Sequence, residues 1–148
     1  MQKTRITIKG YGVVNGVAEG PALVSEQNIS LWGGLDPQTG LIIDKRLKIY
    51  GQQVRGRVLV FPQGKGSTTG AIVLLEAVRC GNAPAAIINI RTEPILASGA
   101  LMAQIFYKKE IPIVDRLEKN PLKAIHTNDH VKVNGNKGIV EITRQRKS

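Results

Sequence analysis

The chain has 148 residues, with 21 lysines and arginines against 11 aspartates and glutamates, so its formal charge is +10. This length suits one domain with a buried core, and the single cysteine excludes an internal disulfide or a cysteine-ligated metal centre held by this chain alone. No apolar run reaches about 18 residues and the first residues lack the apolar stretch of a signal peptide, so we expect a cytoplasmic protein that does not enter a membrane.

The positive charge is spread along the chain rather than gathered in one block. Aromatic residues, which stack on bases in many nucleic-acid-binding proteins, make up only 4% of the sequence. We therefore expect an anionic substrate or an acidic partner protein rather than nucleic acid. A basic binding module for RNA or another polyanion is the alternative.

The first third of the sequence predicts short strands joined by turns. Residues 3–9 alternate polar and apolar side chains, as in a strand with one buried face. Four glycines between residues 10 and 20 interrupt the next stretch. Residues 22–25 and 41–44 are apolar enough to predict two further short strands.

A loop of unusual composition lies between those two strands. It contains Trp32, Gly33, Gly34 and Asp36, followed by a proline. Asp36 favours a tight turn, because an aspartate side chain accepts a hydrogen bond from the backbone two residues further on. The glycine pair equally allows a partner chain to approach, so Gly33, Gly34 and Asp36 are candidate partner-contact residues.

The rest of the sequence predicts two strand–helix–strand crossovers and a hairpin. Apolar runs that alternate with helical segments are typical of parallel strands joined by helices. The expected strands are residues 58–61, 85–90 and 111–115, the expected helices are 71–79 and 98–107, and the expected hairpin is 129–143 with its turn at Asn134-Gly135. These elements predict one α/β domain, residues 1–143, with a mixed sheet or barrel and two or three helices. Residues 144–148 are predicted to form a frayed basic tail.

The strongest candidate for chemistry is the glycine-rich loop between the strand at 58–61 and the helix at 71–79. It reads Gly64-Lys65-Gly66-Ser67-Thr68-Thr69-Gly70. Glycines let a ligand approach the backbone, and the free N–H groups of a helix N-terminus favour an anion. The loop is not a Walker A motif, because Gly66 follows Lys65 where a serine or threonine is required. Capping of the helix explains only one of the three hydroxyl side chains. The other two hydroxyls, beside three glycines and a lysine, therefore predict a functional site.

Ser67 acts as a base only where cations, a metal or helix-end amides stabilise its alkoxide. The loop supplies part of that stabilisation, and the rest must come from elsewhere. Because the single cysteine of this chain cannot hold a metal, we expect a partner chain to provide it. His126 and His130 are four residues apart, but the polar residues between them disfavour a helix, so we expect no metal site there. Cys80 is expected to be a small buried residue at a helix end.

Three motifs together resemble the small subunit of the archaeal aconitase X family. They are the Gly64 to Gly70 loop, the upstream segment from Gly33 to Gly40, and Thr92-Glu93-Pro94-Ile95; the likeness covers about residues 4–143. The resemblance implies a swivelling β/β/α domain like the mobile domain of aconitases. It also implies a heterodimer with a large subunit that carries a four-iron four-sulfur cluster, with no metal or cofactor on this chain alone.

Within the family, the chain resembles the members that dehydrate (R)-5-phosphomevalonate to trans-anhydromevalonate 5-phosphate in the archaeal mevalonate route to isoprenoids. The resemblance makes Ser67 the proton acceptor, acting on the carbon next to the substrate carboxylate. Gly64, Lys65, Gly66, Thr68 and Thr69 are then candidates to bind the phosphorylated carboxylate substrate.

Three alternatives to this activity are considered, two of them from related families. The chain also resembles phosphohistidine swivelling domains, but Gly99 stands where they carry the phosphorylated histidine, so the likeness supports the fold and excludes that activity. Hydroxyproline dehydratases within aconitase X share this small domain, often fused to the large one; a separate chain with many cations fits a phosphorylated substrate better. The third alternative is a non-catalytic subunit that only closes a partner's cleft.

Overall fold

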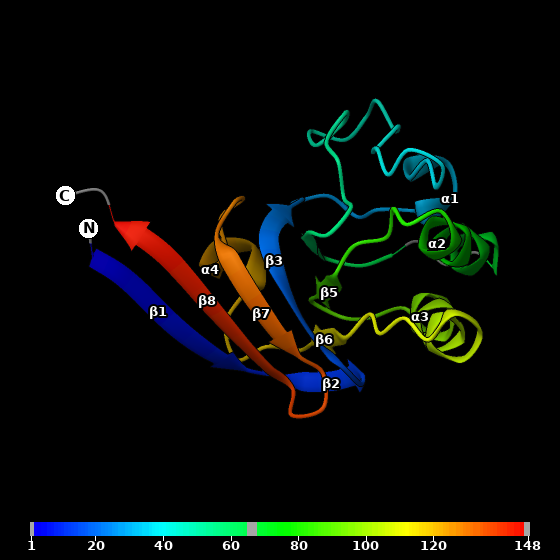
Figure 1. Cartoon of the computed structure of the whole chain (residues 1–148). Helices are drawn as coiled ribbons and strands as arrows, with labels where there is room; N and C mark the ends of the chain where they lie inside the picture. The colour runs from blue at the N-terminus through cyan, green and yellow to red at the C-terminus, as the bar shows by residue number, and fades with distance from the viewer. Residues whose placement is uncertain (1, 65–67, 147–148) are drawn as a thin grey trace.

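In the computed structural model, which describes residues 2–64 and 68–146, eight strands form one mixed sheet (Figure 1). The strand order is β1-β8-β7-β3-β4-β5-β6-β2. The strands are β1 (Gln2–Lys9), β2 (Tyr11–Val14), β3 (Val17–Val24), β4 (Val58–Phe61), β5 (Ala86–Asn89), β6 (Ile113–Asp115), β7 (His130–Asn134) and β8 (Ile139–Arg146). The described helices are α1 (Leu31–Gly34), α2 (Thr68–Arg79), α3 (Pro94–Tyr107) and α4 (Pro121–Ala124). The predicted α/β fold with a mixed sheet is confirmed, and α2 and α3 are its two long helices.

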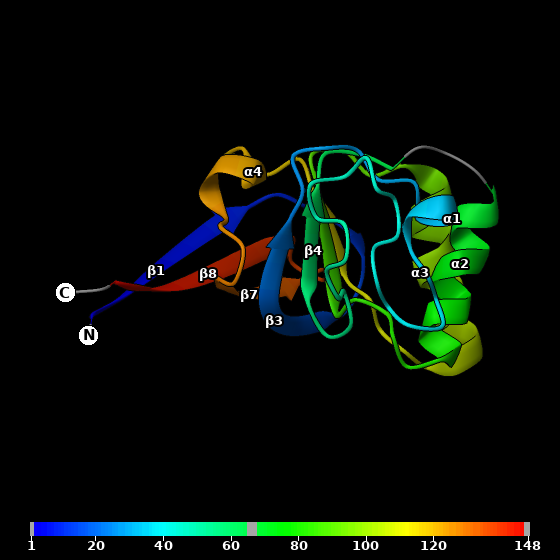
Figure 2. The same ribbon diagram turned by 90° about the horizontal axis from the view of Figure 1, so that it is seen from above.

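Strands β3, β4, β5 and β6 run parallel, and α2 and α3 provide the crossovers from β4 to β5 and from β5 to β6. All four residues of β4 and of β5 are buried, as expected where a parallel sheet is covered on both faces. Figure 2 shows α1, α2 and α3 together on one side of these strands. The two predicted crossovers are therefore confirmed.

The other face of the parallel strands is covered by the antiparallel half of the sheet. Strand β3 joins the two halves, because it pairs with β7 at its start and with β4 at its end. Alternate residues of β4 serve the two sides: Leu59 and Phe61 pack in the cluster that contains Leu74 of α2, whereas Val58 and Val60 pack in the cluster built from β7 and β8. The result is the β/β/α layering that the family resemblance implied, visible from one side of Figure 2 to the other.

The segment at residues 41–44 is not a strand. Only two isolated bridges occur there, between Leu35 and Ile42 and between Leu41 and Gln53. Asp44 then begins a turn, in which its carboxylate accepts a hydrogen bond from the backbone N–H of Arg46 at 3.0 Å. The apolar residues suited a strand, but the chain places no continuous partner strand beside them.

Helix α3 begins at Pro94, four residues earlier than predicted. Both carboxylate oxygens of Glu93 accept backbone hydrogen bonds, from Ile95 at 2.8 Å and from Leu96 at 3.1 Å. A capping carboxylate followed by proline is a favourable helix start. The first turn therefore belongs to the helix, and its proline stands at the first helical position, where proline is favoured.

Residues 144–146 belong to a strand rather than to a frayed tail. Strand β8 continues to Arg146 and pairs with the first residues of β1, so the predicted tail is wrong for residues 144–146. The β7–β8 hairpin is confirmed, but Asn134 pairs with Ile139, which makes the connection four residues long. Gly138 takes the positive φ of +70° in that connection. Across the described residues, no helix has the length and apolar character needed to cross a membrane.

Candidate functional site at the carboxyl edge of the parallel strands

Strands β4, β5 and β6 end at the same edge of the sheet, and the loops that follow them are tied together there. The backbone N–H of Ile90, after β5, donates to the carbonyl of Pro62, after β4, at 3.0 Å. The backbone N–H of Arg116, after β6, donates to the carbonyl of Ile90, also at 3.0 Å. Ligands of open α/β sheets bind outside the carboxyl ends of the strands, so this edge is the candidate site.

The predicted glycine-rich loop begins at this edge. Gly64 forms a parallel bridge with Ile29, and the N–H of Ile29 donates to the carbonyl of Gln63 at 3.3 Å. A Cβ atom at Gly64 would meet the Ile29 carbonyl oxygen at 3.7 Å, an ordinary contact, and one at Gly70 would meet nothing within 4 Å. Packing among the described residues therefore does not explain why glycine stands at either position.

Helix α2 starts directly after the loop, at Thr68. Its first turn carries no acidic residue, and Thr69 and Gly70 are partly buried there. The first N–H groups of a helix and its dipole favour an anion at this end. Lys65, Gly66 and Ser67 lie outside the described residues, so their predicted roles stay predictions.

The hollow beside this helix start is too small for a substrate. It is bounded by the glycine-rich loop and the starts of both long helices, and its lining residues are Ile29, Leu31, Phe61, Gly64, Gly70, Glu93, Ile95 and Leu96. Its volume of about 20 Å³ holds roughly one water molecule. The described part of this edge is therefore an open rim rather than an enclosed pocket, and the described residues alone do not enclose a small molecule here.

Polar residues that the sequence interpretation missed hold the rim together. Asp115 is 3% exposed; one carboxylate oxygen accepts the N–H of Thr92 at 2.8 Å and the other accepts Nε of Arg116 at 3.0 Å. The Arg116 guanidinium lies 4.1 Å from the centre of the Tyr11 ring, and its backbone has a φ of +49°. Asp115 thereby fixes the loop after β5 and presents a half-exposed arginine at the same edge.

Asn89 adds a second buried contact under the rim. Its side chain is fully buried, and Nδ2 donates to the carbonyl of Phe61 at 3.0 Å, which joins the ends of β4 and β5. Its Oδ1 and the hydroxyl of Thr92 have no hydrogen-bond partner among the described residues. The sequence signals for these residues were an asparagine at the end of one apolar strand and an aspartate, followed by arginine, at the end of another.

The segment at residues 32–37 leads away from this edge, because Nδ2 of Asn82, between α2 and β5, donates to the carbonyl of Pro37 at 3.2 Å. The turn predicted at Asp36 is confirmed. The Asp36 carboxylate accepts the N–H of Gln38 at 2.9 Å, and its carbonyl accepts the N–H of Gly40 at 2.8 Å. Gly33 has a φ of +81°, and a Cβ there would meet nothing within 4 Å. Asp36 thus has a structural role, whereas Gly33 borders open space and Gly34 is buried.

His126 lies in the turn before β7 and shares a hollow with Val24 and Ser25 at the end of β3, whereas His130 is the first residue of β7. His130 Nε2 is 2.9 Å from a carboxylate oxygen of Glu19. In the described parts of the chain, no three histidine, cysteine or acidic residues gather closely enough to hold a metal ion. Cys80 is partly buried just beyond α2 rather than fully buried as predicted.

The layered fold and the rim at the carboxyl edge are those of a swivelling domain, and comparisons with known proteins agree. Residues 7–142 match the aconitase X swivel domain, and the chain belongs to that family. The crystal structure of Thermococcus kodakaraensis aconitase X in its holo-form has a TM-score of 0.83 and 39% sequence identity to this chain, covering 93% of this chain and 98% of that one.

More narrowly, the chain is similar to proteins named phosphomevalonate dehydratase small subunit. The one from Methanocella arvoryzae is 49% identical over 136 residues, covering 92% of this chain and 98% of the relative. The one from Methanosarcina acetivorans is 43% identical over 143 residues, covering 97% and 95%. The predicted resemblance is therefore confirmed along almost the whole chain.

Proposed function

We propose that this chain is the small subunit of a hydro-lyase that dehydrates (R)-5-phosphomevalonate to trans-anhydromevalonate 5-phosphate in the mevalonate pathway. The observation that carries the proposal is the 49% identity over 92% of the chain to a protein named as that small subunit. The anion-favouring start of α2, at the rim of the sheet, supports a negatively charged substrate.

The active site is shared with a large subunit. The described residues form an open rim with a hollow of about 20 Å³, which does not enclose a substrate. They also offer no group of side chains that could ligate a metal ion. A four-iron four-sulfur cluster on the large subunit would supply the Lewis acid that the loss of the hydroxyl group needs.

Ser67 is the proton acceptor in this proposal. In the sequence Ser67 directly precedes Thr68, the first residue of α2, and N–H groups at a helix start are donors of the kind that stabilise an alkoxide. Ser67 takes the proton from the carbon next to the carboxylate. The electron pair of that C–H bond becomes the new double bond as the hydroxyl departs. The departing hydroxide takes up one proton and leaves as water, and Ser67 gives its proton back to solvent, which restores the base. Lys65, Thr68 and Thr69 orient an anionic group of the substrate.

Reconstitution tests the function. The chain and its large subunit, purified separately and mixed without oxygen, are expected to dehydrate phosphomevalonate, whereas each subunit alone is inactive. The assay follows formation of the unsaturated product by mass spectrometry. Turnover of hydroxyproline in place of phosphomevalonate would assign the chain to the other aconitase X reaction. An inactive mixture, together with salt-sensitive binding of the free chain to RNA, would instead support the basic binding module.

A further inference from the structure

Helix α3 is apolar on its exposed side as well as on its buried side. None of its fourteen residues is charged. Leu96, Gly99, Ala100 and Ala103 face the core, yet Leu101, Ile105 and Phe106 are 47%, 72% and 67% exposed. A helix at a protein surface normally turns polar residues to water, and one that is apolar all round is normally covered.

The exposed apolar surface continues onto the neighbouring helices. Ile72 of α2 and Trp32 of α1 are each 62% exposed. The helices α2 and α3 pack closely, because a Cβ atom at Gly99 would lie 3.1 Å from the Cα atom of Ala71. Figures 1 and 2 both show α1, α2 and α3 side by side in one layer. We call the set Trp32, Ile72, Leu101, Ile105 and Phe106 the helix-layer stripe.

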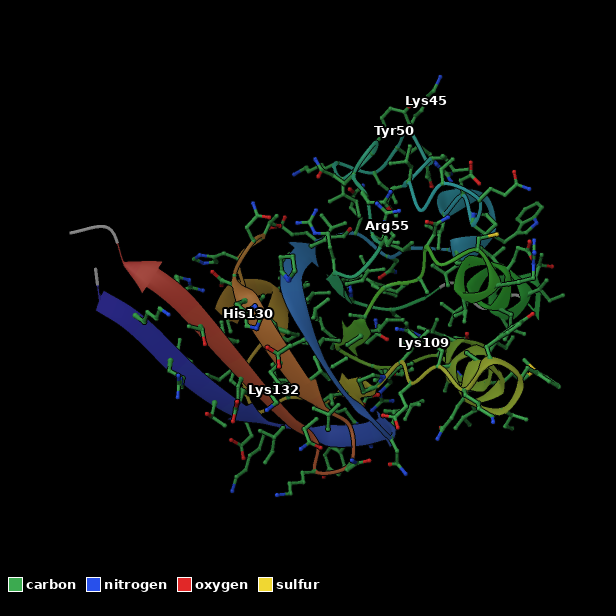
Figure 3. All side chains as sticks on the ribbon, in the orientation of Figure 1. Lys45, Tyr50, Arg55, Lys109, His130 and Lys132 are labelled. Atoms are coloured by element: carbon green, nitrogen blue, oxygen red, sulfur yellow. The ribbon has the colours of Figure 1, made fainter. Side chains whose placement is uncertain are left out.

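Several cations of the chain lie away from this stripe. In Figure 3 the labelled cations Lys45, Arg55, Lys109 and Lys132 come from the loops and from β7, not from the outer side of the helix layer. No member of the stripe is charged. A surface of this kind fits an apolar protein partner rather than a polyanion, because the cores of permanent interfaces are depleted in charge.

The stripe is continuous with the rim. Trp32 directly precedes Gly33, which borders open space, and Ile72 is one turn beyond Thr68, where α2 starts. A protein that encloses the substrate at the rim is therefore within reach of the stripe at Trp32 and at Ile72. Relatives that match 95–98% of their own length carry the name small subunit, which implies a larger partner.

We propose that the helix-layer stripe is the docking surface for the large subunit of the proposed dehydratase, and this inference rests on the proposed function. Leu101 and Ile105 are one helical turn apart on the same side of α3 and form its centre. The partner surface is apolar and covers the outer side of α2 and α3 in addition to the rim.

Charge substitutions on the stripe test the proposal. Leu101→Glu and Ile105→Glu are each expected to weaken binding to the large subunit by about 30-fold or more, as for central interface residues. Val17→Glu is the matched control, since Val17 is 44% exposed on the antiparallel half and its change is expected to leave affinity within about 3-fold. Affinity is measured by calorimetry, and circular dichroism checks that each variant is folded.

The outcomes separate the two proposals. If the wild-type chain assembles into an active enzyme and both stripe variants bind the large subunit with unchanged affinity, the docking-surface proposal is overturned. The proposed function is then unaffected. Failure of the wild-type chain to bind the large subunit contradicts both. A third outcome is that the wild-type chain self-associates, that Ile105→Glu abolishes this self-association, and that binding to the large subunit is unaffected. This result assigns the stripe to a second copy of the chain and also overturns the proposal.

Discussion

Asp129 and Arg144 form a partly buried ion pair that fastens the start of β7 to the end of β8. Arg144 donates from Nη2 to Asp129 at 2.6 Å and from Nε at 3.0 Å, and it also donates to the carbonyl of Ala124. Burial alone would raise the pKa of Asp129, but the hydrogen bonds from Arg144 and from the His126 N–H, with the Arg144 charge, outweigh it and hold the pKa below its usual value.

This pair makes stability depend on pH in the acid range. Because the pKa of Asp129 is lower in the folded chain, its carboxylate stabilises the fold above the unfolded pKa of about 3.9, and that contribution is lost as pH falls through the folded value. Asp129→Asn is expected to lower the free energy of unfolding by about 1–3 kcal/mol at pH 7, and the gap to wild type narrows at pH 3. Urea unfolding at both pH values measures it.

Asp44→Asn is the control for that comparison. Asp44 pairs with Arg46, whose side chain is 83% exposed, and exposed pairs contribute little. The control is expected to change stability little at either pH. A gap between Asp129→Asn and wild type that is the same at pH 3 and pH 7 would contradict the role of the charged pair.

At the scale of elements, the contact between α2 and α3 depends on a small residue. A Cβ atom at Gly99 would lie 3.1 Å from the Ala71 Cα atom and 3.3 Å from its Cβ and carbonyl oxygen. Gly99→Val is therefore expected to lower the free energy of unfolding by about 1–3 kcal/mol, because the helices must separate. The neighbouring Ser98→Val, at an exposed position of the same helix, is expected to stay within about 0.5 kcal/mol.

Thermal unfolding of both variants checks this contact. Equal melting temperatures for Gly99→Val and Ser98→Val would contradict it. The same packing bears on the phosphohistidine likeness, since a histidine side chain at Gly99 would collide with α2 in this chain. The absence of that residue is thus part of how the helices pack.

The elements that the sequence predicted well are those whose pattern is set by their own residues. Residues 58–61 and 85–90 are apolar runs bounded by turn residues, and both occur as buried parallel strands. Residues 41–44 have a similar composition, but a strand also needs a neighbour, which the local sequence does not reveal. The pairing of residues 144–146 with the first strand was missed for the same reason, because it joins the two ends of the chain.

The candidate site also has a part that the sequence predicted and a part that it did not. The glycine-rich loop and the Asp36 turn were recognisable because each is a contiguous motif. The rim residues Asn89, Thr92 and Asp115 are separated in sequence and meet only because β4, β5 and β6 end side by side. The stripe was missed because an apolar helix predicts burial, and whether another chain provides the cover depends on the assembled layers.

At the scale of the whole molecule, three parts of the fold have three different roles. The antiparallel half buries one face of the parallel strands with residues such as Val131, Val140 and Ile142. The helices bury the other face and present the apolar stripe. The carboxyl edge between them carries the glycine-rich loop. Under the proposed function, this edge forms one side of a cleft that the large subunit completes, and a catalytic group on it acts only in the assembled protein.

The most direct measurement of that account is the turnover number of the assembled enzyme with Ser67→Ala. The variant is expected to bind the large subunit as tightly as wild type, yet to dehydrate phosphomevalonate about 10²–10⁴ times more slowly, because the proton acceptor is lost. Ser98→Ala, a serine on the exposed side of α3, is expected to retain wild-type turnover. Near-normal turnover of Ser67→Ala in a fully assembled enzyme would contradict the account and leave this chain as a non-catalytic subunit.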